Sequence, residues 1–339
     1  MTTPSFVFKV PPMKTTWSRH WSWHTGLICL CWLIGCAACD AWAIEPSLPK
    51  SIKIVVGPGP DLLARGVAEQ LTESLNIPVI VEQKTGGGGV IAGDAVAKSP
   101  ADGAQLLLST GSFTINSLLQ PNPPYQFSKD LTPVSLLATL PFVLIVKTES
   151  KFKSLGDIVQ YAKSNPDKLN YASSGNGTPP HILGEMLKQY ADVKVPHIPY
   201  KSAAAAMNDV LGGQVDFMFV PAPTALSLIK SDKLRALAVT SSQRYPGLPQ
   251  VATMMESGYA KFVMLGWNGI HVSSKTPKNL ITLLNTHLVK AVKSPQLQNT
   301  ITQNGFEPVG SSAEFFAEFV QQDIDKNRAV IQQANIKVE

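Results

Sequence analysis

Short β-rich runs alternate with amphipathic segments through the first third of the chain. Residues 51–56 (SIKIVV), 79–82 and 106–109 predict strands, because each is rich in Val, Ile or Leu and lies next to Gly, Pro or Ser. Asp61 is the predicted N-cap of a helix that follows the first strand, and residues 90–98 predict a second helix. Since strand, loop and helix alternate, this part predicts a parallel sheet with its loops gathered at one edge.

The alternation continues to the C-terminus. Strands are predicted at residues 142–146, 171–172, 195–198, 215–220 and 234–239, with helices at 154–164, around 182–187 and at 203–211. From about residue 264 the pattern predicts a return to the first part, with a strand at 267–271 and helices at 277–293 and 312–333. The expected fold is therefore two α/β lobes. Residues 44–143 and 264–339 form the first lobe, and residues 144–263 form the second.

The first 43 residues have the pattern of an export signal peptide. Lys14 and Arg19 precede an apolar run at residues 26–38, and Ala41-Trp42-Ala43 has the small-x-small form of a cleavage site. We favour cleavage after Ala43, just before the first strand. The alternative is a lipoprotein signal at Leu33-Ile34-Gly35-Cys36, which would leave Cys36 as a lipidated N-terminus. Both alternatives predict a protein that works outside the cytoplasm, in the periplasm.

Charge and cysteine content exclude several classes of function. The formal net charge is +5 with no basic run and no interleaved aromatic stripe, so nucleic acid is not an expected partner. All four cysteines precede residue 40, which removes disulfides, thiolate zinc sites and cysteine nucleophiles from the body of the chain. No metal site is expected either, because no His-x-x-x-His pair occurs among the isolated histidines His181, His197, His271 and His287.

Loops of one chemical character recur at strand ends, each just before a helix. They are small, and rich in glycine or hydroxyl groups, at residues 57–61, 86–89, 109–116 and 173–178. Helix N-termini present unpaired amides and a partial positive charge, so they bind carboxylates or phosphates without Lys or Arg. Glycines let the backbone approach a ligand, and hydroxyls add donors. The loops predict a small-anion site, although any single loop of this kind is also explained by turn formation alone.

A dinucleotide site is one interpretation of Gly86-Gly87-Gly88-Gly89, which follows a strand and precedes a helix. The spacing is imperfect, the strand is not the first, and the chain carries an export signal, so no cofactor is expected. Nucleophilic catalysis is one interpretation of Ser174 and His181, which a helix starting near Pro179 would bring within reach of each other. No orienting acid is evident and Gly-x-Ser-x-Gly is absent. We expect no enzyme, with an exported hydrolase kept as the alternative from another class.

From about Leu48 to the C-terminus the sequence resembles the Bug family, the extracytoplasmic solute receptors of the tripartite tricarboxylate transporter system. The matching stretches are IKIVV, VIVEQKTGGGGVIAGDAVAKSPADG, LTPVSLLAT, LNYASSGNGTPPHILGEML, IPYKSAAAAMNDVLGGQVDFMF, LRALAVTSSQRYPGLPQVATMMESG and GFEPVG. The resemblance implies a type II periplasmic-binding-protein fold, with two α/β lobes around a ligand cleft. It also implies a carboxylated ligand that is handed to a membrane transporter.

The sequence departs from the family pattern at two places. Family members usually carry a longer first loop of the form P-F-x-x-G-G-x-x-D, whereas this chain has only Gly57-Pro58-Gly59-Pro60-Asp61. After the strand VDFMF the family often has an acidic residue followed by Asn, whereas this chain has Val220-Pro221. Both departures bear on the identity of the ligand, and the second favours a more apolar one.

The expected function is capture of a small organic acid by lobe closure, followed by delivery to tripartite tricarboxylate-type transporter subunits. The protein is expected to act as a monomer. A further alternative is a ligand-sensing interaction protein with a degenerate pocket. The predicted cleft residues are Pro60, Asp61, Gly88, Gly89, Ser109, Thr110, Ser112, Ser174, Asn176, Thr178, His181 and Lys201.

Overall fold

The computed structural model describes residues 48–57 and 61–337. The predicted signal peptide at residues 1–43, the lipidation alternative at Cys36 and the predicted site residue Pro60 lie outside these residues. Within the described part, no helix is both long and apolar enough to cross a membrane.

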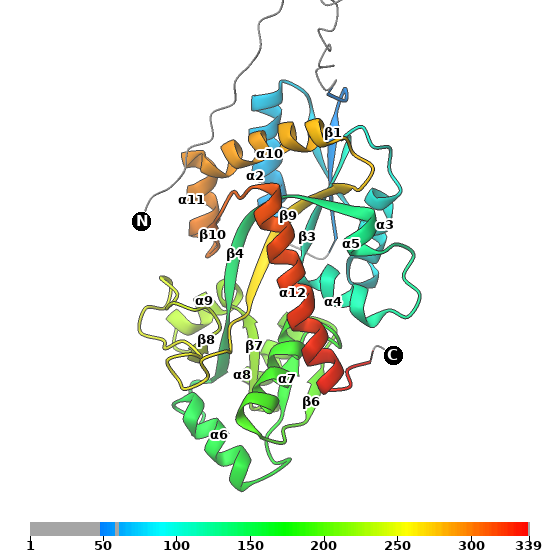
Figure 1. Cartoon of the computed structure of the whole chain (residues 1–339). Helices are drawn as coiled ribbons and strands as arrows, with labels where there is room; N and C mark the ends of the chain where they lie inside the picture. Colours follow the sequence, from blue (N-terminus) through cyan, green and yellow to red (C-terminus); the bar gives the residue numbers. More distant parts are fainter. Residues whose placement is uncertain (1–47, 58–60, 338–339) are drawn as a thin grey trace, which may run out of the picture. The chain divides into compact units, whose positions relative to one another are not determined.

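The first lobe is a mixed sheet between two helical layers (Figure 1). Strands β1 (Ile52–Val56), β2 (Val79–Gln83) and β3 (Gln105–Thr110) are parallel to one another. The sheet is extended by β9 (Leu265–Ser273), which is antiparallel to β3, and by β4 (Leu131–Lys147), which is antiparallel to β9 and to the short β10 (Glu307–Pro308). The parallel sheet predicted for the first three strands is confirmed, whereas the strands that extend it are antiparallel. The antiparallel direction of β9 and β4 is set by hydrogen bonds between strands that are far apart in the sequence. The local pattern of residues does not predict such pairings.

Helices cover both faces of this sheet. One face packs on α2 (Asp61–Leu75), α10 (Lys278–Lys293) and α11 (Pro295–Gln303) through a core of aliphatic side chains. The other packs on α3 (Val90–Ala97), α4 (Gly111–Leu119), α5 (Phe127–Asp130) and α12 (Ala313–Gln333), around Trp267 and Phe316. Residues 109–116, predicted as a loop from their composition, fold mostly into α4. Thr110 is its N-cap, and the Thr110 hydroxyl accepts a hydrogen bond from the Ser112 amide.

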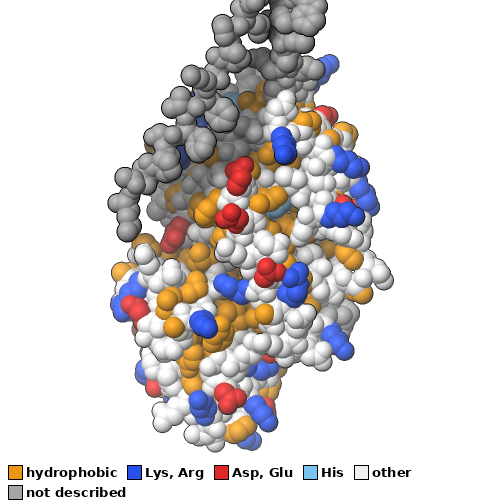
Figure 2. Space-filling model, viewed as in Figure 1, with side chains coloured by type: hydrophobic (Ala, Val, Ile, Leu, Met, Phe, Trp, Pro, Cys, Tyr) orange, Lys and Arg blue, Asp and Glu red, His pale blue; other side chains and the backbone are white. Residues whose placement is uncertain are grey.

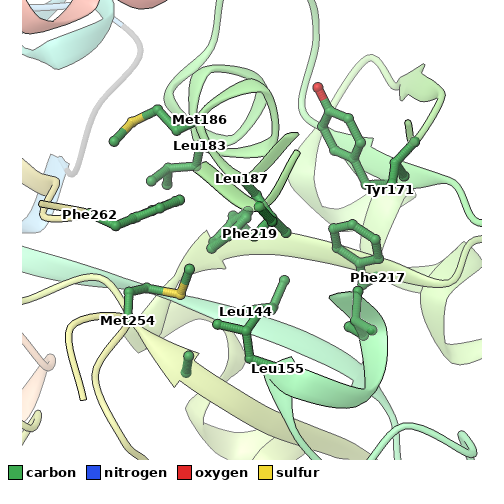
Figure 3. Packing of buried hydrophobic residues seen from close by; sticks show 14 of the residues in the cluster. Leu144, Leu155, Tyr171, Leu183, Met186, Leu187, Phe217, Phe219, Met254 and Phe262 are labelled. Carbon is green, nitrogen blue, oxygen red and sulfur yellow. The ribbon is translucent and has the colours of Figure 1, made fainter. Parts of the chain in front are cut away.

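The second lobe has the same layered plan. Its strands are β5 (Tyr171–Ser173), β6 (His197–Pro199), β7 (Phe217–Pro221) and β8 (Leu234–Val239), together with the second half of β4. Helices α6 (Leu155–Ser164) and α7 (Pro179–Ala191) pack on one face in the aromatic-rich core drawn in Figure 3. Helices α8 (Ala203–Leu211) and α9 (Ala222–Lys230) pack on the other face. Ser154 and Ser202 cap α6 and α8 through hydrogen bonds from the amides of Asp157 and Ala205.

Two elements are shared by the lobes. Strand β4 pairs with β9 along Leu131–Pro141 and then with β7 and β8 from Phe142 onward. Helix α12 packs Phe316, Val320 and Ile324 on the first lobe and packs Val330 and Ile331 on the core of the second. The Lys326 ammonium in the middle of α12 donates a hydrogen bond to the carbonyl of Val263, 2.8 Å away, where the chain leaves the second lobe. Because β4 and α12 contact both lobes, they mark no sharp border between them. The lobe boundaries at residues 143/144 and 263/264 therefore remain our proposal.

Candidate functional site

A cleft of about 810 Å³ lies between the lobes. Its walls come from strand ends and from the first turns of α4, α7, α8 and α9. The wall on the first lobe consists of Gly87, Gly88, Thr110, Gly111, Ser112, Asn116, Gln120 and Asp323. The wall on the second lobe consists of Ser174, Asn176, Gly177, Thr178, Pro179, Pro180, Lys201, Ser202, Ala203, Pro221 and Thr224. Leu140, Phe142, Met264, Leu265, Gly266, Trp267, Asn268 and Phe306 complete the lining.

Many of the residues predicted from the sequence lie on these walls. They come from loops that are far apart in the chain, and they are Gly88, Thr110, Ser112, Ser174, Asn176, Thr178 and Lys201. Helices α4 and α8 begin at the cleft, and the first amides of a helix have no acceptor within the helix. Their dipoles also add positive potential, so the cleft suits a small anion more than its single lysine suggests.

The glycine loop is held against α4 by a tight fit. Gly86, Gly87, Gly88 and Gly89 all have positive φ, between 54° and 125°, a region that other residues rarely adopt. The Asn116 side-chain amide donates to the carbonyl of Gly88, 2.8 Å away, and a Cβ on Gly88 would lie only 2.1 Å from that amide nitrogen. Glycines at this position therefore let the loop close onto the α4 face that lines the cleft.

Other predicted residues lie behind the cleft wall. Gly89 is buried, and a Cβ there would lie 2.7 Å from the Phe113 ring. Ser109 is also buried, and its hydroxyl contacts the Gly269 carbonyl at 3.0 Å and His271 Nδ1 at 2.7 Å. Asp61 begins α2 and is paired with Arg65 at 2.8 Å. None of the three residues is part of the cleft lining, because Gly89 is buried and the side chains of Ser109 and Asp61 have partners inside their own lobe.

His181 supports the second-lobe loop from beneath. Its Nδ1 accepts a hydrogen bond from the Gly177 amide at 3.0 Å, and its ring stacks on His197 with the centroids 3.9 Å apart. His197 Nε2 in turn contacts the Ser173 hydroxyl at 2.7 Å. Burial lowers the pKa of His181 and lowers that of His197 to about 3, so both rings are neutral at physiological pH. The histidine pair therefore fixes the shape of the loop at residues 173–178.

The same contacts leave the hydrolase alternative without support. His181 Nδ1 is engaged by an amide, and its Nε2 faces the Glu185 carboxylate at 4.0 Å. Within the described residues no hydrogen bond joins His181 to Ser174. A general base must reach the proton that it abstracts, so this histidine is not positioned as the partner of Ser174.

The amides of the second-lobe loop are largely used within the loop. The Gly175 amide donates to the Ser173 hydroxyl, the Gly177 amide to His181, and the Thr178 amide to the Gly175 carbonyl. Prolines at the first two positions of α7 bring no amide hydrogen. On this side of the cleft, the Ser174 hydroxyl, the Asn176 side chain and the start of α8 therefore offer more hydrogen-bond donors than the start of α7 does.

Asp323 is a cleft residue that reasoning from the sequence missed. Its carboxylate accepts a hydrogen bond from the Thr114 hydroxyl at 2.6 Å, and that same hydroxyl lies 2.9 Å from the Gly111 carbonyl. The side-chain N–H groups of Trp267 and Asn327 act on the carboxylate from nearby, but neither forms a hydrogen bond with it. Burial raises the pKa of Asp323 to about 6, although these donors oppose the shift. The sequence signal is weak, since one acid among several on a predicted amphipathic helix indicates no particular site.

The support given by His181 is open to a direct test. Replacing His181 by Ala is expected to lower the free energy of unfolding by about 1–3 kcal/mol, because the buried Gly177 amide loses its acceptor. Urea unfolding followed by circular dichroism measures this change. His287→Ala is the control, since His287 contacts Ser74 at 3.1 Å near the surface of the first lobe. Equal losses in the two variants would contradict the supporting role of His181.

Comparison with known proteins agrees with this architecture. The model of the tripartite tricarboxylate transporter family receptor matches residues 63–336. Protein BugT of Bordetella pertussis is 34% identical over 297 residues, which cover 86% of this chain and 91% of BugT. The solved periplasmic binding protein BugD is 32% identical with a TM-score of 0.74, and the match covers 86% of this chain and all (100%) of BugD.

Two further solved structures include an organic acid. An R. palustris protein with adipate is 28% identical with a TM-score of 0.76, over 86% of this chain and 99% of that protein. MatC from Rhodopseudomonas palustris with bound malate is 26% identical with a TM-score of 0.72, over 84% of this chain and 100% of MatC. These relatives share the two-lobed α/β fold of periplasmic solute-binding proteins. With most of its length matched by the receptor model and by BugT, this chain belongs to the tripartite tricarboxylate transporter receptor family, the Bug proteins.

Proposed function

We propose that this chain is an exported receptor that captures a small carboxylate between its lobes and delivers it to a tripartite tricarboxylate-type transporter. The observation that carries the proposal is the cleft itself, which has a volume of about 810 Å³ and is lined by helix N-termini from both lobes. The ligands of relatives, adipate and malate, support the same class of small organic acid.

The proposed mechanism is closure of the lobes around the ligand. Ligand oxygens would accept hydrogen bonds from the start of α4 on one lobe and from Ser174, Asn176 and the start of α8 on the other. A ligand that contacts both lobes binds the closed state more tightly than the open state and so shifts the population toward closure. A transporter subunit would recognise the closed surface. We infer no catalytic step.

Export and oligomeric state complete the proposal. The solved relative BugD is a periplasmic binding protein. We infer that residues 1–43 are a signal peptide and that the mature protein acts as a periplasmic monomer.

Figure 2 shows acidic and basic side chains interspersed over the described part of one face. That distribution favours a small-molecule ligand over nucleic acid.

The proposal is tested by thermal unfolding of the mature protein with mono-, di- and tricarboxylates. A ligand that binds only the native state raises the melting temperature. At a concentration of one hundred times Kd it increases the free energy of unfolding by about 2.7 kcal/mol. We expect at least one carboxylate to do so, and Ser174→Ala to weaken that ligand at least fivefold without unfolding the protein. Ser164→Ala, at the exposed end of α6, is the matched control. A panel in which no carboxylate raises the melting temperature would refute the proposal.

A further inference from the structure

The charges that line the cleft are few and opposed. Among the described lining residues the only cation is Lys201 and the only acid is Asp323. Lys201 lies just before α8 on the second lobe and is exposed. Asp323 lies in the middle of α12, beside Ile324, which packs in the core of the first lobe. A ligand that spans the cleft therefore meets a positive charge on one lobe and a negative charge on the other.

The position of Asp323 is fixed. Thr114 of α4 holds one carboxylate oxygen at 2.6 Å, and Trp267 and Asn327 face the group from β9 and from the next turn of α12. Lys326, the nearest cation along the helix, donates its hydrogen bond to the Val263 carbonyl. Within the described residues no Lys or Arg forms an ion pair with Asp323. The carboxylate is therefore held by Thr114, and Lys326 acts on it only through its nearby charge, without an ion pair.

Most of the remaining surface near the lobe connections is apolar, and its polar side chains are Thr224 and Asn268. Leu140 and Phe142 come from β4, Met264 and Leu265 from the return crossing, Pro221 from the end of β7, and Phe306 from the chain before β10. Apolar walls of this kind stabilise an apolar ligand body by removing it from water. They offer no hydrogen bond to a second ligand carboxylate.

We propose that Asp323 is a specificity-determining residue, which makes this receptor select acids with one carboxylate and an apolar remainder over dicarboxylates of the same length. The inference rests on the proposed function, capture of a carboxylate in this cleft. One carboxylate is satisfied by the helix N-termini and Lys201. A second carboxylate at the far end of the ligand would lie against apolar side chains or beside the Asp323 carboxylate, where like charges repel.

Hexanoate and adipate form the matched pair of ligands, because both have six carbons and differ only in the second carboxylate. Calorimetric titration at pH 8 keeps Asp323 ionised, since burial raises the pKa of this group only to about 6. We expect hexanoate to bind the wild-type protein at least tenfold more tightly than adipate, because the second carboxylate of adipate is repelled by the like charge of Asp323.

The matched pair of variants lies on the same helix. Asp323→Asn removes the charge and keeps the shape, so it is expected to tighten adipate binding and to narrow the ratio of the two affinities at least fivefold. Asp325→Asn is the control, because Asp325 is exposed and pairs with Arg328 at 2.7 Å outside the cleft. It should leave the ratio unchanged.

The outcomes separate the two proposals. Adipate binding to the wild-type protein as tightly as hexanoate would overturn the selectivity inference and leave carboxylate capture standing. The selectivity inference is equally overturned if Asp323→Asn leaves the ratio unchanged. If neither acid binds, and no other carboxylate raises the melting temperature, the proposed function fails and the inference falls with it. The wild-type comparison needs no variant, so it decides the matter even if Asp323→Asn does not fold.

Discussion

Gly184→Ala is expected to destabilise the protein by about 3 kcal/mol, because overpacking a rigid core forces neighbouring side chains out of place. A Cβ on Gly184 in α7 would lie 2.0 Å from the Tyr171 ring. That ring is unable to shift, since it stacks on His197 and Phe217 with centroids 4.8 and 5.9 Å away. Its hydroxyl also donates to Glu185 at 2.7 Å. Figure 3 shows Tyr171 and Phe217 side by side in this core.

The control for this prediction is another helical glycine. At Gly156 in α6, the nearest atom to an added Cβ is the Ser154 hydroxyl at 3.5 Å, an ordinary contact. Gly156→Ala is therefore expected to be neutral or to stabilise the protein by up to about 1 kcal/mol, because alanine loses less backbone entropy on folding. Urea unfolding midpoints of the two variants measure the difference. Similar midpoints would show that Tyr171 can move aside.

Asp323→Asn is expected to stabilise the protein in a pH-dependent way. Burial raises the pKa of Asp323 in the native state from 3.8 to about 6. Between these values the unfolded chain releases the proton while the native protein keeps it. The wild-type protein therefore loses stability as pH rises through this window, by up to about 3 kcal/mol in total. The variant has no proton to lose at this position, so its advantage should grow from pH 4 to pH 6.5 and then level off.

The hydrogen-bond donors around Asp323 favour its ionised form and so limit the size of this shift. The Thr114 hydroxyl has one proton but two acceptors within reach, the Gly111 carbonyl and the Asp323 carboxylate. Thr114 therefore stabilises the ionised carboxylate only in part, and burial decides the sign of the shift. Chemical denaturation of wild type and variant at a series of pH values tests the prediction. A difference that stays constant with pH, or that falls as pH rises, would contradict it. Asp325→Asn is expected to change stability by less than about 0.5 kcal/mol, because exposed ion pairs contribute little.

Much of the local structure is predictable from the sequence. The helices expected at 203–211 and 312–333 match α8 and α12 within a residue, because capping serines and apolar periodicity mark their ends. Strand β4 is predicted only over its second half. Its sequence, LTPVSLLATLPFVLIVK, is buried on both faces, so it lacks the alternation that identifies a strand, and its two prolines favour a break. Helix α9 escapes prediction because it begins directly at the end of β7 with no capping side chain.

The candidate site is predictable in part for a related reason. Loops at strand ends can be recognised from their composition, which is rich in glycine and hydroxyl groups. The predicted loop residues Ser174, Asn176 and Lys201 do line the cleft. Asp323 is more than 120 residues away from these loops in the chain, and only the packing of α12 brings it to the cleft. The role of His181 depends on its stacking against His197, a contact between a helix and a strand that spacing does not encode.

The continuity of β4 has a consequence for how the molecule unfolds. Residues 131–141 are hydrogen-bonded in one sheet and residues 142–147 in the other, with no loop between them. A fragment that contained either lobe alone would end inside a buried strand and would leave its neighbours with an unpaired edge. Melting of one lobe therefore removes strand partners from the other. We therefore expect the two lobes to unfold as a single cooperative unit, with the most slowly exchanging amides in the strand that both of them share.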